Sequence, residues 1–199
     1  MKIIGVTGPT GAGKTTVLRA FEALGCVCID CDALYHSLLQ TSPALSEELT
    51  ARFGRSILNN QGEVDRKTLG SIVFSDPDAL ADLNAITHRH ILARCRALIA
   101  QAEQEQVKGL VFDAVSLFQS RLSDLCDVTL AVVAPDEVRL RRIIQRDRIA
   151  EPSARARMAS QPANDYYVNL CDYAVSTDDS TQEQELFDQV AQMFSCILC

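Results

Sequence analysis

Apolar residues recur along the chain with two different periods. Short, nearly continuous apolar runs are typical of buried parallel strands, and they occur at 2–7, 27–30, 109–113 and 127–133. Apolar residues at three- and four-residue spacing predict helices over 15–24, 79–102, 136–148 and 181–197. Strands that alternate with helices predict an α/β fold whose helices cover both faces of a parallel sheet.

Two stretches are more than a minimal sheet of this kind needs. The segment from about 32 to 102 is mostly helical in pattern and lies between the second and third strands. The segment 136–162 has the pattern of an arginine-rich pair of helices. We therefore expect one domain over residues 1–199, in which the first stretch is a helical insertion and the second is a lid.

A glycine-rich motif between the first strand and the first helix carries the clearest chemistry. The segment GPTGAGKT at 8–15 satisfies the P-loop pattern G-x-x-x-x-G-K-[ST]. Glycines let the backbone curl until successive N–H groups face one anion, and the helix start adds free donors and the positive end of its dipole. The motif predicts a three-layer P-loop NTPase fold and these nucleotide-binding residues: Gly8, Gly11, Ala12, Gly13, Lys14, Thr15 and Thr16.

The same motif assigns roles to two side chains. Lys14 is expected to reach the β- and γ-phosphates, and the Thr15 hydroxyl is expected to bind Mg²⁺. Asp113 ends the apolar strand 109–113 in the manner of a Walker B aspartate, which holds Mg²⁺ through water. ATP and Mg²⁺ are therefore the expected cofactors.

Two carboxylates follow the second strand. Ligands of open parallel sheets bind beyond the carboxyl ends of strands, so Asp30 and Asp32 fall where a transferred phosphoryl group is expected. Asp32 is a candidate for orienting an attacking hydroxyl and accepting its proton. If the strand continues that far, alternation puts both carboxylates on one side. Alternatively, Asp32 is the N-cap of the helical run 33–39, and the two roles are compatible.

Three arginines fall on one edge of the helix predicted over 136–148. At about 100° per residue, Arg139, Arg142 and Arg146 share that edge. Guanidinium groups gathered there suit a polyphosphate and the charge of its transition state, which makes Arg142 and Arg146 catalytic candidates. The alternative is a solvated helix face.

Composition narrows the function classes. The net charge of −7 and the sequence pI of about 4.9 do not suit a general nucleic-acid binder. We see no apolar run of the roughly 18 residues that a membrane span needs, and the first residues are too quickly polar for a signal peptide. We expect a cytosolic protein that binds neither nucleic acid nor membrane, with a monomer as the default state.

The eight cysteines include a cluster at Cys26, Cys28 and Cys31. Such a cluster can hold a metal, but it has no second C-x-x-C pair, and it lies in a strand-like apolar stretch where Cys behaves as a small hydrophobe. The segment 196–199 has the spacing of a prenylation signal, yet it also continues an apolar helix, which is the interpretation we favour.

Several segments together resemble the dephospho-coenzyme A kinase family. The P-loop is generic, whereas the Asp-x-Asp at 30–32 and the spacing between Phe74, Pro77 and His88 are more diagnostic. The resemblance runs in order along nearly the whole chain, through Arg52-Phe53-Gly54, 83–88, 113–118, 145–147, 157–161 and 172–173.

The resemblance implies a reaction and its residues. The family transfers the γ-phosphate of ATP to the 3′-hydroxyl of the dephospho-CoA ribose, the last step of coenzyme A synthesis. By position, Asp32 would be the general base, and Lys14 with Arg142 or Arg146 would stabilise the transferring group. The insertion would hold dephospho-CoA, with substrate-binding candidates Asp32, His36 and His88.

The chain departs from the family pattern at three places. Arg89 follows His88 where the family usually has proline, Gln119 replaces a glutamate, and 176–179 reads STDD where the family often has DNSG. Gln119 removes a charge near the expected site, and Thr177 lies in a region expected near adenine. Another P-loop nucleoside or metabolite kinase, and a degenerate kinase that only binds ATP, stay open as alternatives. A GTPase switch needs N-K-x-D, and the nearest string, at 169–172, lacks the lysine.

Overall fold

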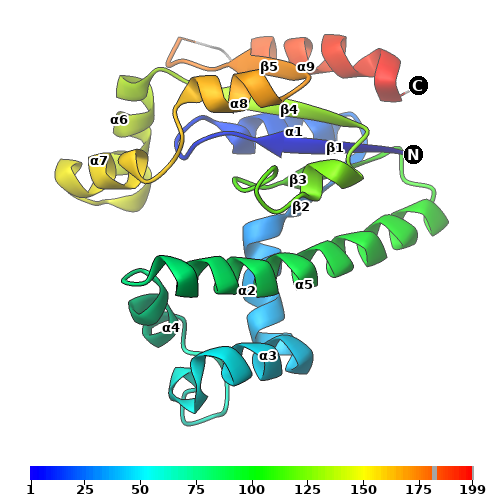
Figure 1. Ribbon diagram of the computed structural model, residues 1–199. Helices are drawn as coiled ribbons and strands as arrows, with labels where there is room; N and C mark the ends of the chain where they lie inside the picture. The colour runs from blue at the N-terminus through cyan, green and yellow to red at the C-terminus, as the bar shows by residue number, and fades with distance from the viewer. Residues whose placement is uncertain (181–182, 199) are drawn as a thin grey trace. The chain divides into compact units, whose positions relative to one another are not determined.

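The central feature of the fold is a parallel sheet (Figure 1). A computed structural model describes residues 1–180 and 183–198, with side chains through Ser195. In this described part, five strands pair in the order β2-β3-β1-β4-β5, and every pairing is parallel. The predicted α/β fold is confirmed. The strands are β1 (Lys2–Thr7), β2 (Cys26–Asp30), β3 (Gly109–Asp113), β4 (Val128–Val133) and β5 (Tyr173–Ser176).

The strand order places the P-loop at the carboxyl ends of the strands, in the middle of the sheet. β1 lies between β3 and β4, with Val6 beside Asp113 and Thr7 beside Ala131. Asp113 in turn pairs with Asp30 at the end of β2. The chain enters the P-loop from the carboxyl end of β1, which is the position where open α/β sheets bind ligands.

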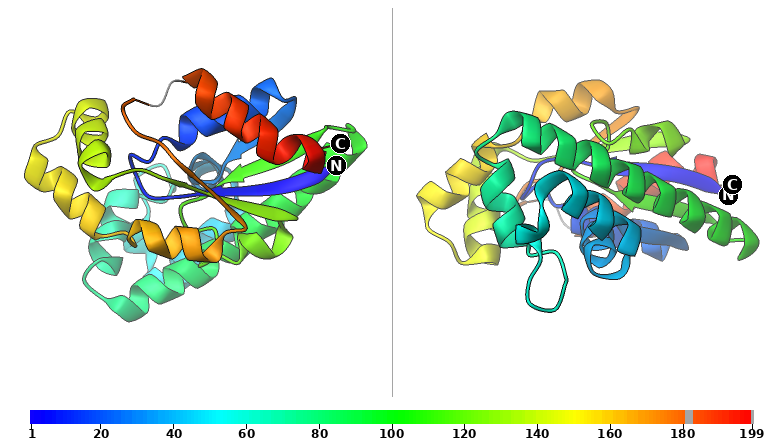
Figure 2. Two further views of the ribbon diagram at one scale, coloured as in Figure 1. Left: turned by 90° about the horizontal axis from the view of Figure 1, so that it is seen from above. Right: turned by 60° about the horizontal axis from the view of Figure 1, so that its bottom comes forward.

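Helices cover both faces of the sheet. On one face, α1 (Lys14–Ala23) and α9 (Glu183–Leu198) pack together, and the Phe21 and Phe194 rings meet edge-on with centroids 4.9 Å apart. On the other side lies α8 (Asn164–Leu170), which contacts β4 (Figure 2, left). Helices therefore lie on both faces of the sheet, as the near-continuous apolar strands predict.

The last helix was predicted over 181–197, and its expected start lies outside the described residues. The apolar spacing predicts an inner side made of Phe187, Val190, Met193, Phe194 and Ile197. Val190 and Phe194 are buried, and Phe187 and Met193 are partly buried against the same core. The side chain of Ile197 and the end of the 196–199 motif lie outside the described part. The core also contains Leu186, which the prediction did not include.

Two helices follow β4 and form the arginine-rich segment. α6 (Asp136–Asp147) and α7 (Glu151–Ala159) pack on each other through Leu140, Ile143 and Ala154. Arg148 ends α6 in a left-handed conformation with φ of 52°. A residue in that conformation closes a helix and turns the chain, and here it leads into the second helix of the pair.

The chain divides into two units, which are described separately. One consists of Met1–Asp30 with Gln101–Cys199, and the other is Cys31–Ala100. The expected insertion at about 32–102 overlaps the second unit almost completely. Its elements are α2 (Cys31–Thr41), α3 (Pro43–Phe53), the short 3-10 helix η1 (Arg55–Ile57), α4 (Arg66–Val73) and α5 (Pro77–Gln104), whose last turn belongs to the first unit.

The second unit has its own apolar core. Seven buried residues from its helices pack together, namely Leu39, Leu45, Leu49, Ile57, Leu69, Val73 and Ala79. Side-chain caps define where its helices begin: the Ser42 hydroxyl accepts from Leu45 N at 3.3 Å, and the Asp65 carboxylate accepts from Lys67 N at 2.8 Å. Asp76 caps α5 in the same way, accepting from Asp78 N at 2.9 Å.

The structure answers two questions that the sequence left open about Asp32. β2 ends at Asp30, so the strand does not continue to Asp32, and α2 already begins at Cys31, so Asp32 is not its N-cap. Asp32 lies in the first turn of α2, where the positive end of the helix dipole favours a carboxylate. The acid therefore supports the helix from inside its first turn.

Candidate functional site

The P-loop holds a conformation that only glycine can adopt at two of its positions. Gly8 and Gly11 have φ of 145° and 78°. A Cβ added to Gly8 would lie 2.0 Å from the carbonyl oxygen of Val132, and one added to Gly11 would lie 2.8 Å from that of Arg139. The neighbouring backbone thus requires these glycines, in addition to any need of a bound phosphate.

The helix after the loop presents its first N–H groups to the same place. α1 starts at Lys14, and its N-cap is Gly13, which has no side chain to cap those groups. The Lys14 ammonium donates to the Gly8 carbonyl at 2.9 Å, so the side chain folds back across the loop. Thr15 is exposed on the first turn. Backbone donors, an ammonium and a hydroxyl gathered in this way fit a nucleoside triphosphate.

Thr10, within the loop, is bound by the arginine-rich segment through all of its polar groups. Its N–H donates to Gln161 Oε1 at 2.8 Å, and its carbonyl accepts from Arg139 Nε at 3.0 Å. Its hydroxyl oxygen lies 3.3 Å from Arg146 Nη2, which donates to it. Thr10 therefore joins the P-loop to the arginine-rich segment through three hydrogen bonds. Gln161 was visible in the sequence only as part of the family resemblance.

The three arginines expected on one edge have different surroundings. Arg139 is 2% exposed, and besides Thr10 it donates to Asp136 at 3.0 Å. It lies inside the fold and holds the loop. Arg142 and Arg146 are more accessible, so these two are the members of the set that can face a ligand.

Arg142 lies at a cleft beside the P-loop. Its guanidinium donates to Thr177 Oγ1 at 2.8 Å, to the Asp178 carbonyl at 2.9 Å and to the Gly11 carbonyl at 3.4 Å. The cleft has a volume of about 260 Å³, and its lining is Gly13, Thr16, Arg142, Thr177, Asp178, Glu183 and Leu186. Four of these residues come from the segment after β5, which the strand and helix pattern alone did not connect to the P-loop.

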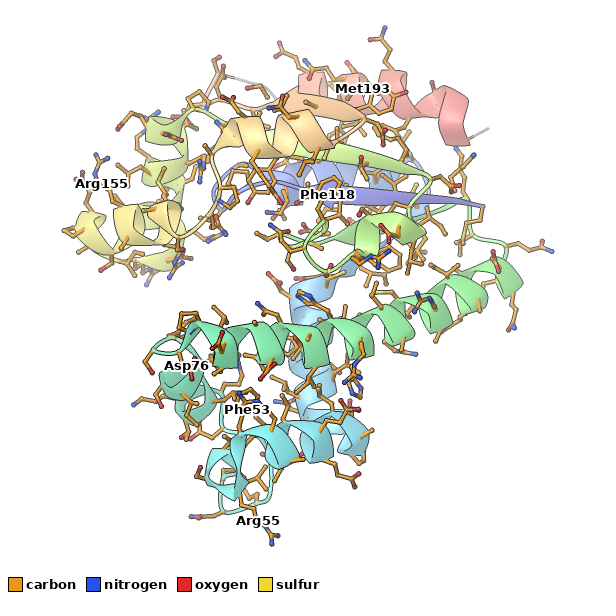
Figure 3. The ribbon with its side chains drawn as sticks, in the orientation of Figure 1. Phe53, Arg55, Asp76, Phe118, Arg155 and Met193 are labelled. Carbon is orange, nitrogen blue, oxygen red and sulfur yellow. The ribbon has the colours of Figure 1, made fainter. Side chains whose placement is uncertain are left out.

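Arg146 is held by its neighbour in the chain. Its Nε donates to Asp147 Oδ1 at 2.8 Å, and this hydrogen bond raises the pKa of Arg146 and lowers the pKa of Asp147. Arg157, from α7, also donates to Asp147. Arg155, labelled in Figure 3, is exposed on α7 and pairs with Glu151 at 2.8 Å. Asp147 thus aligns Arg146 beside Thr10.

Asp113 is the last residue of β3, so it lies at the same carboxyl end of the sheet as the P-loop. It is half-buried and pairs in register with Val6, two residues before the loop begins at Gly8. This is where a Walker B carboxylate is expected. Among the described residues, no group of three or more His, Cys, Asp or Glu side chains is placed to hold a metal ion. Cys26 and Cys28 are residues of β2, and burial raises the pKa of the Cys28 thiol to about 12.

The remaining candidates belong to the second unit. Asp32 is exposed in the first turn of α2, and His36 follows on the same helix with a buried Nδ1 that has no hydrogen-bond partner among the described residues. His88 is half-buried in α5. A hydrogen bond from the Cys31 thiol lowers the pKa of Cys95, which joins the start of α2 to α5.

The departures at Arg89 and Gln119 have simple surroundings. Arg89 Nη2 donates to Glu48 Oε2 at 2.6 Å, and α5 continues through this position without interruption. Proline at Arg89 would remove an N–H donor from the middle of the helix, whereas arginine keeps it and adds a tie to α3. Gln119 is exposed in the turn that follows β3.

The stability of the second unit is expected to depend on the protonation of His88. Burial lowers the pKa of His88 below its ordinary value, so the unfolded chain binds a proton more readily than the folded one. The free energy of unfolding should therefore fall as the pH drops below about 6.5, the pKa of an unperturbed histidine, and be unaffected above it. Between pH 7.5 and pH 5.5, urea titrations should show a smaller loss of unfolding free energy for His88→Gln than for the unaltered protein. Equal losses in both proteins would contradict this.

Comparison with known proteins gives the family. The family model described as dephospho-CoA kinase matches residues 2–183. The chain belongs to the dephospho-CoA kinase family. A dephospho-CoA kinase from Corynebacterium diphtheriae is 34% identical over 192 residues, which cover 96% of this chain and 94% of that protein. Membership in the dephospho-CoA kinase family makes the chain a kinase and overturns the GTPase alternative.

Solved structures agree with the fold. The crystal structure of a Thermus thermophilus protein aligns with a TM-score of 0.81 and 26% identity, covering 100% of this chain and 98% of that one. A dephospho-CoA kinase from Campylobacter jejuni aligns with a TM-score of 0.67 and 24% identity, covering 98% and 96%. The fold of a solved dephospho-CoA kinase is therefore shared over 98% of this chain. No helix in the described part has the length and apolar character to cross a membrane.

Proposed function

We propose that the chain transfers the γ-phosphate of ATP to the 3′-hydroxyl of the dephospho-CoA ribose and so forms coenzyme A. The observation that carries this proposal is the family match over residues 2–183, in which the P-loop at 8–15 has the conformation of a phosphate cradle. The curated relative from Corynebacterium diphtheriae bears the same activity in its name.

The chemistry follows from the residues. The acceptor oxygen attacks the γ-phosphorus, the bond to the β–γ bridging oxygen breaks, and ADP leaves with that oxygen. Asp32 is the proposed base that takes the hydroxyl proton. Lys14 and Arg142 or Arg146 offset the charge on the phosphoryl oxygens during transfer. The backbone N–H groups of Gly8, Gly11, Ala12 and Gly13, together with the start of α1 at Thr15 and Thr16, bind the nucleotide.

Further parts of the proposal concern the metal and the acceptor. Thr15 would hold Mg²⁺, with Asp113 acting through water, and the ion would neutralise phosphate charge. The unit Cys31–Ala100 supplies acceptor-binding residues, with His36 and His88 as candidates beside Asp32. The arginine-rich segment 136–162 serves as the lid. We propose a cytosolic monomer whose ligands are these small molecules.

A coupled assay of ADP release tests the function. The purified protein is given Mg-ATP and dephospho-CoA, and parallel samples receive adenosine, shikimate or no acceptor. We expect ADP release that depends on dephospho-CoA, with a product heavier than the acceptor by one phosphate in mass spectrometry and phosphorylated at the ribose. Turnover with another alcohol but not with dephospho-CoA would identify a different metabolite kinase. ATP binding without turnover on any acceptor would indicate the degenerate alternative.

A further inference from the structure

Thr177 connects three segments of the first unit. It follows β5, and its N–H donates to the Val133 carbonyl at 2.9 Å, which extends the pairing of β5 with β4 by one residue. The side chain is buried, with 3% of the residue exposed. Its hydroxyl donates to the Ala12 carbonyl at 2.8 Å and accepts from Arg142 Nη1 at 2.8 Å. One hydroxyl thus uses both its donor and its acceptor capacity.

The bond to Ala12 acts on the P-loop itself. The C=O of Ala12 and the N–H of Gly13 belong to one planar trans peptide, so they point in opposite directions. A hydroxyl that fixes the carbonyl therefore also fixes the direction of the Gly13 N–H. That N–H belongs to the last loop residue before α1, where phosphate-binding donors are placed.

The bond to Arg142 acts on the cleft. An arginine side chain has many rotamers, and holding it in one of them costs conformational entropy that a binding site must otherwise supply when the ligand arrives. The hydrogen bond from Arg142 to Thr177 is the shortest of its three to the surrounding oxygens, and both residues line the cleft. Thr177 thus restricts the guanidinium to one position at the cleft, which lowers the entropy cost of binding a ligand there.

We propose that Thr177 is a positioning residue for nucleotide binding, whose hydroxyl fixes Arg142 and the Ala12–Gly13 peptide relative to each other. The proposal rests on the proposed function in that the P-loop binds the nucleotide. Thr177 is one of the places where the chain departs from the family pattern, so the role is argued from this chain's own contacts.

The test compares Thr177→Val with Thr177→Ser. Valine keeps the branched shape and loses the hydroxyl, whereas serine keeps the hydroxyl. For Thr177→Val we expect the Kd for ADP in calorimetry and the KM for ATP to rise about tenfold, as the loss of a hydrogen bond to a charged group implies. We expect kcat to fall less than these two constants rise, because Lys14 and Arg146 are held by partners other than Thr177. Thr177→Ser should stay close to the unaltered protein in all three quantities.

Thr129→Val is the matched control. Thr129 is also buried, its hydroxyl donates to Asp172 Oδ2 at 2.7 Å, and it accepts from Asp172 N at 3.0 Å. It lies in the first half of β4, opposite Gly5, and is not among the residues that line the cleft. This variant should lose stability in urea titrations and leave the Kd for ADP unchanged.

Three results would overturn the proposal: unchanged ADP binding by Thr177→Val, an equal defect in Thr177→Ser, or an equal rise in Kd for Thr129→Val. The calorimetry needs no acceptor. If the unaltered protein fails to phosphorylate dephospho-CoA, the proposed function fails, while ADP binding by the variants still decides the role of Thr177.

Discussion

Lys14→Ala is expected to lower kcat for dephospho-CoA phosphorylation by about a thousandfold, because it removes a fixed positive charge from the transferring phosphoryl group. The ammonium donates to the Gly8 carbonyl, which places it across the phosphate-binding loop. Little apolar area is lost, since Lys14 is only half-buried. The measurement is steady-state turnover together with urea unfolding, which should show a fold that is retained.

Arg19→Ala provides the matched control for Lys14→Ala. Arg19 lies on the same helix, α1, but pairs with Glu183 at 3.1 Å on the exposed surface. Removing this cation changes the net charge by the same amount, and exposed ion pairs contribute little to stability. Its turnover should stay near that of the unaltered protein. If both variants lose activity equally, the effect comes from general charge, and the assigned role of Lys14 is wrong.

Asp32→Asn is expected to reduce kcat by a factor of about a hundred to ten thousand, the range for loss of a general base, while the Kd for ATP changes little. Asparagine keeps the size of the side chain but cannot accept the proton of the acceptor hydroxyl. Single-turnover measurements and ATP titrations separate the two quantities. Equal losses in both would show that Asp32 acts on the nucleotide or on the fold instead.

The position of Asp32 in a first helical turn calls for its own control. A carboxylate there stabilises a helix by about 0.3–1 kcal/mol, and Asn loses that contribution whatever its role in catalysis. Asp78 occupies the first turn of α5 in the same unit. Asp78→Asn should therefore cost similar stability without the loss of kcat, and a large kcat effect there would mean that helix stability limits the reaction.

Most of the sheet could be predicted because its strands have a distinctive apolar sequence pattern. Parallel strands buried on both faces are almost wholly apolar, so β1 and β3 were predicted at their observed bounds and β2 and β4 to within one residue. β5 was missed by pattern, because it is a short edge strand with three of its four residues exposed. Edge strands lack the continuous apolar run on which the prediction depended.

The P-loop was recognised because its chemistry is local in sequence. The residues around it were not, since Thr177 lies 165 positions from its partner Ala12 and Gln161 lies 151 from Thr10. Neither contact leaves a spacing signal, and only the packing of β5 and α7 brings them together. In the sequence, Arg139 could not be distinguished from Arg142 and Arg146 on the same helix edge. It is buried because Thr10 packs against it, and a contact with a distant segment cannot be predicted from helix geometry.

The three bonds of Thr10 have a mechanical consequence. Any shift of the loop backbone on phosphate arrival must strain, stretch or exchange contacts with Arg139, Arg146 or Gln161. A displacement of the loop is therefore expected to be passed on to α6 and to the segment that follows α7. A fluorescent label at the exposed Arg155 position on α7 (Figure 3) should therefore change its emission when nucleotide binds at the P-loop.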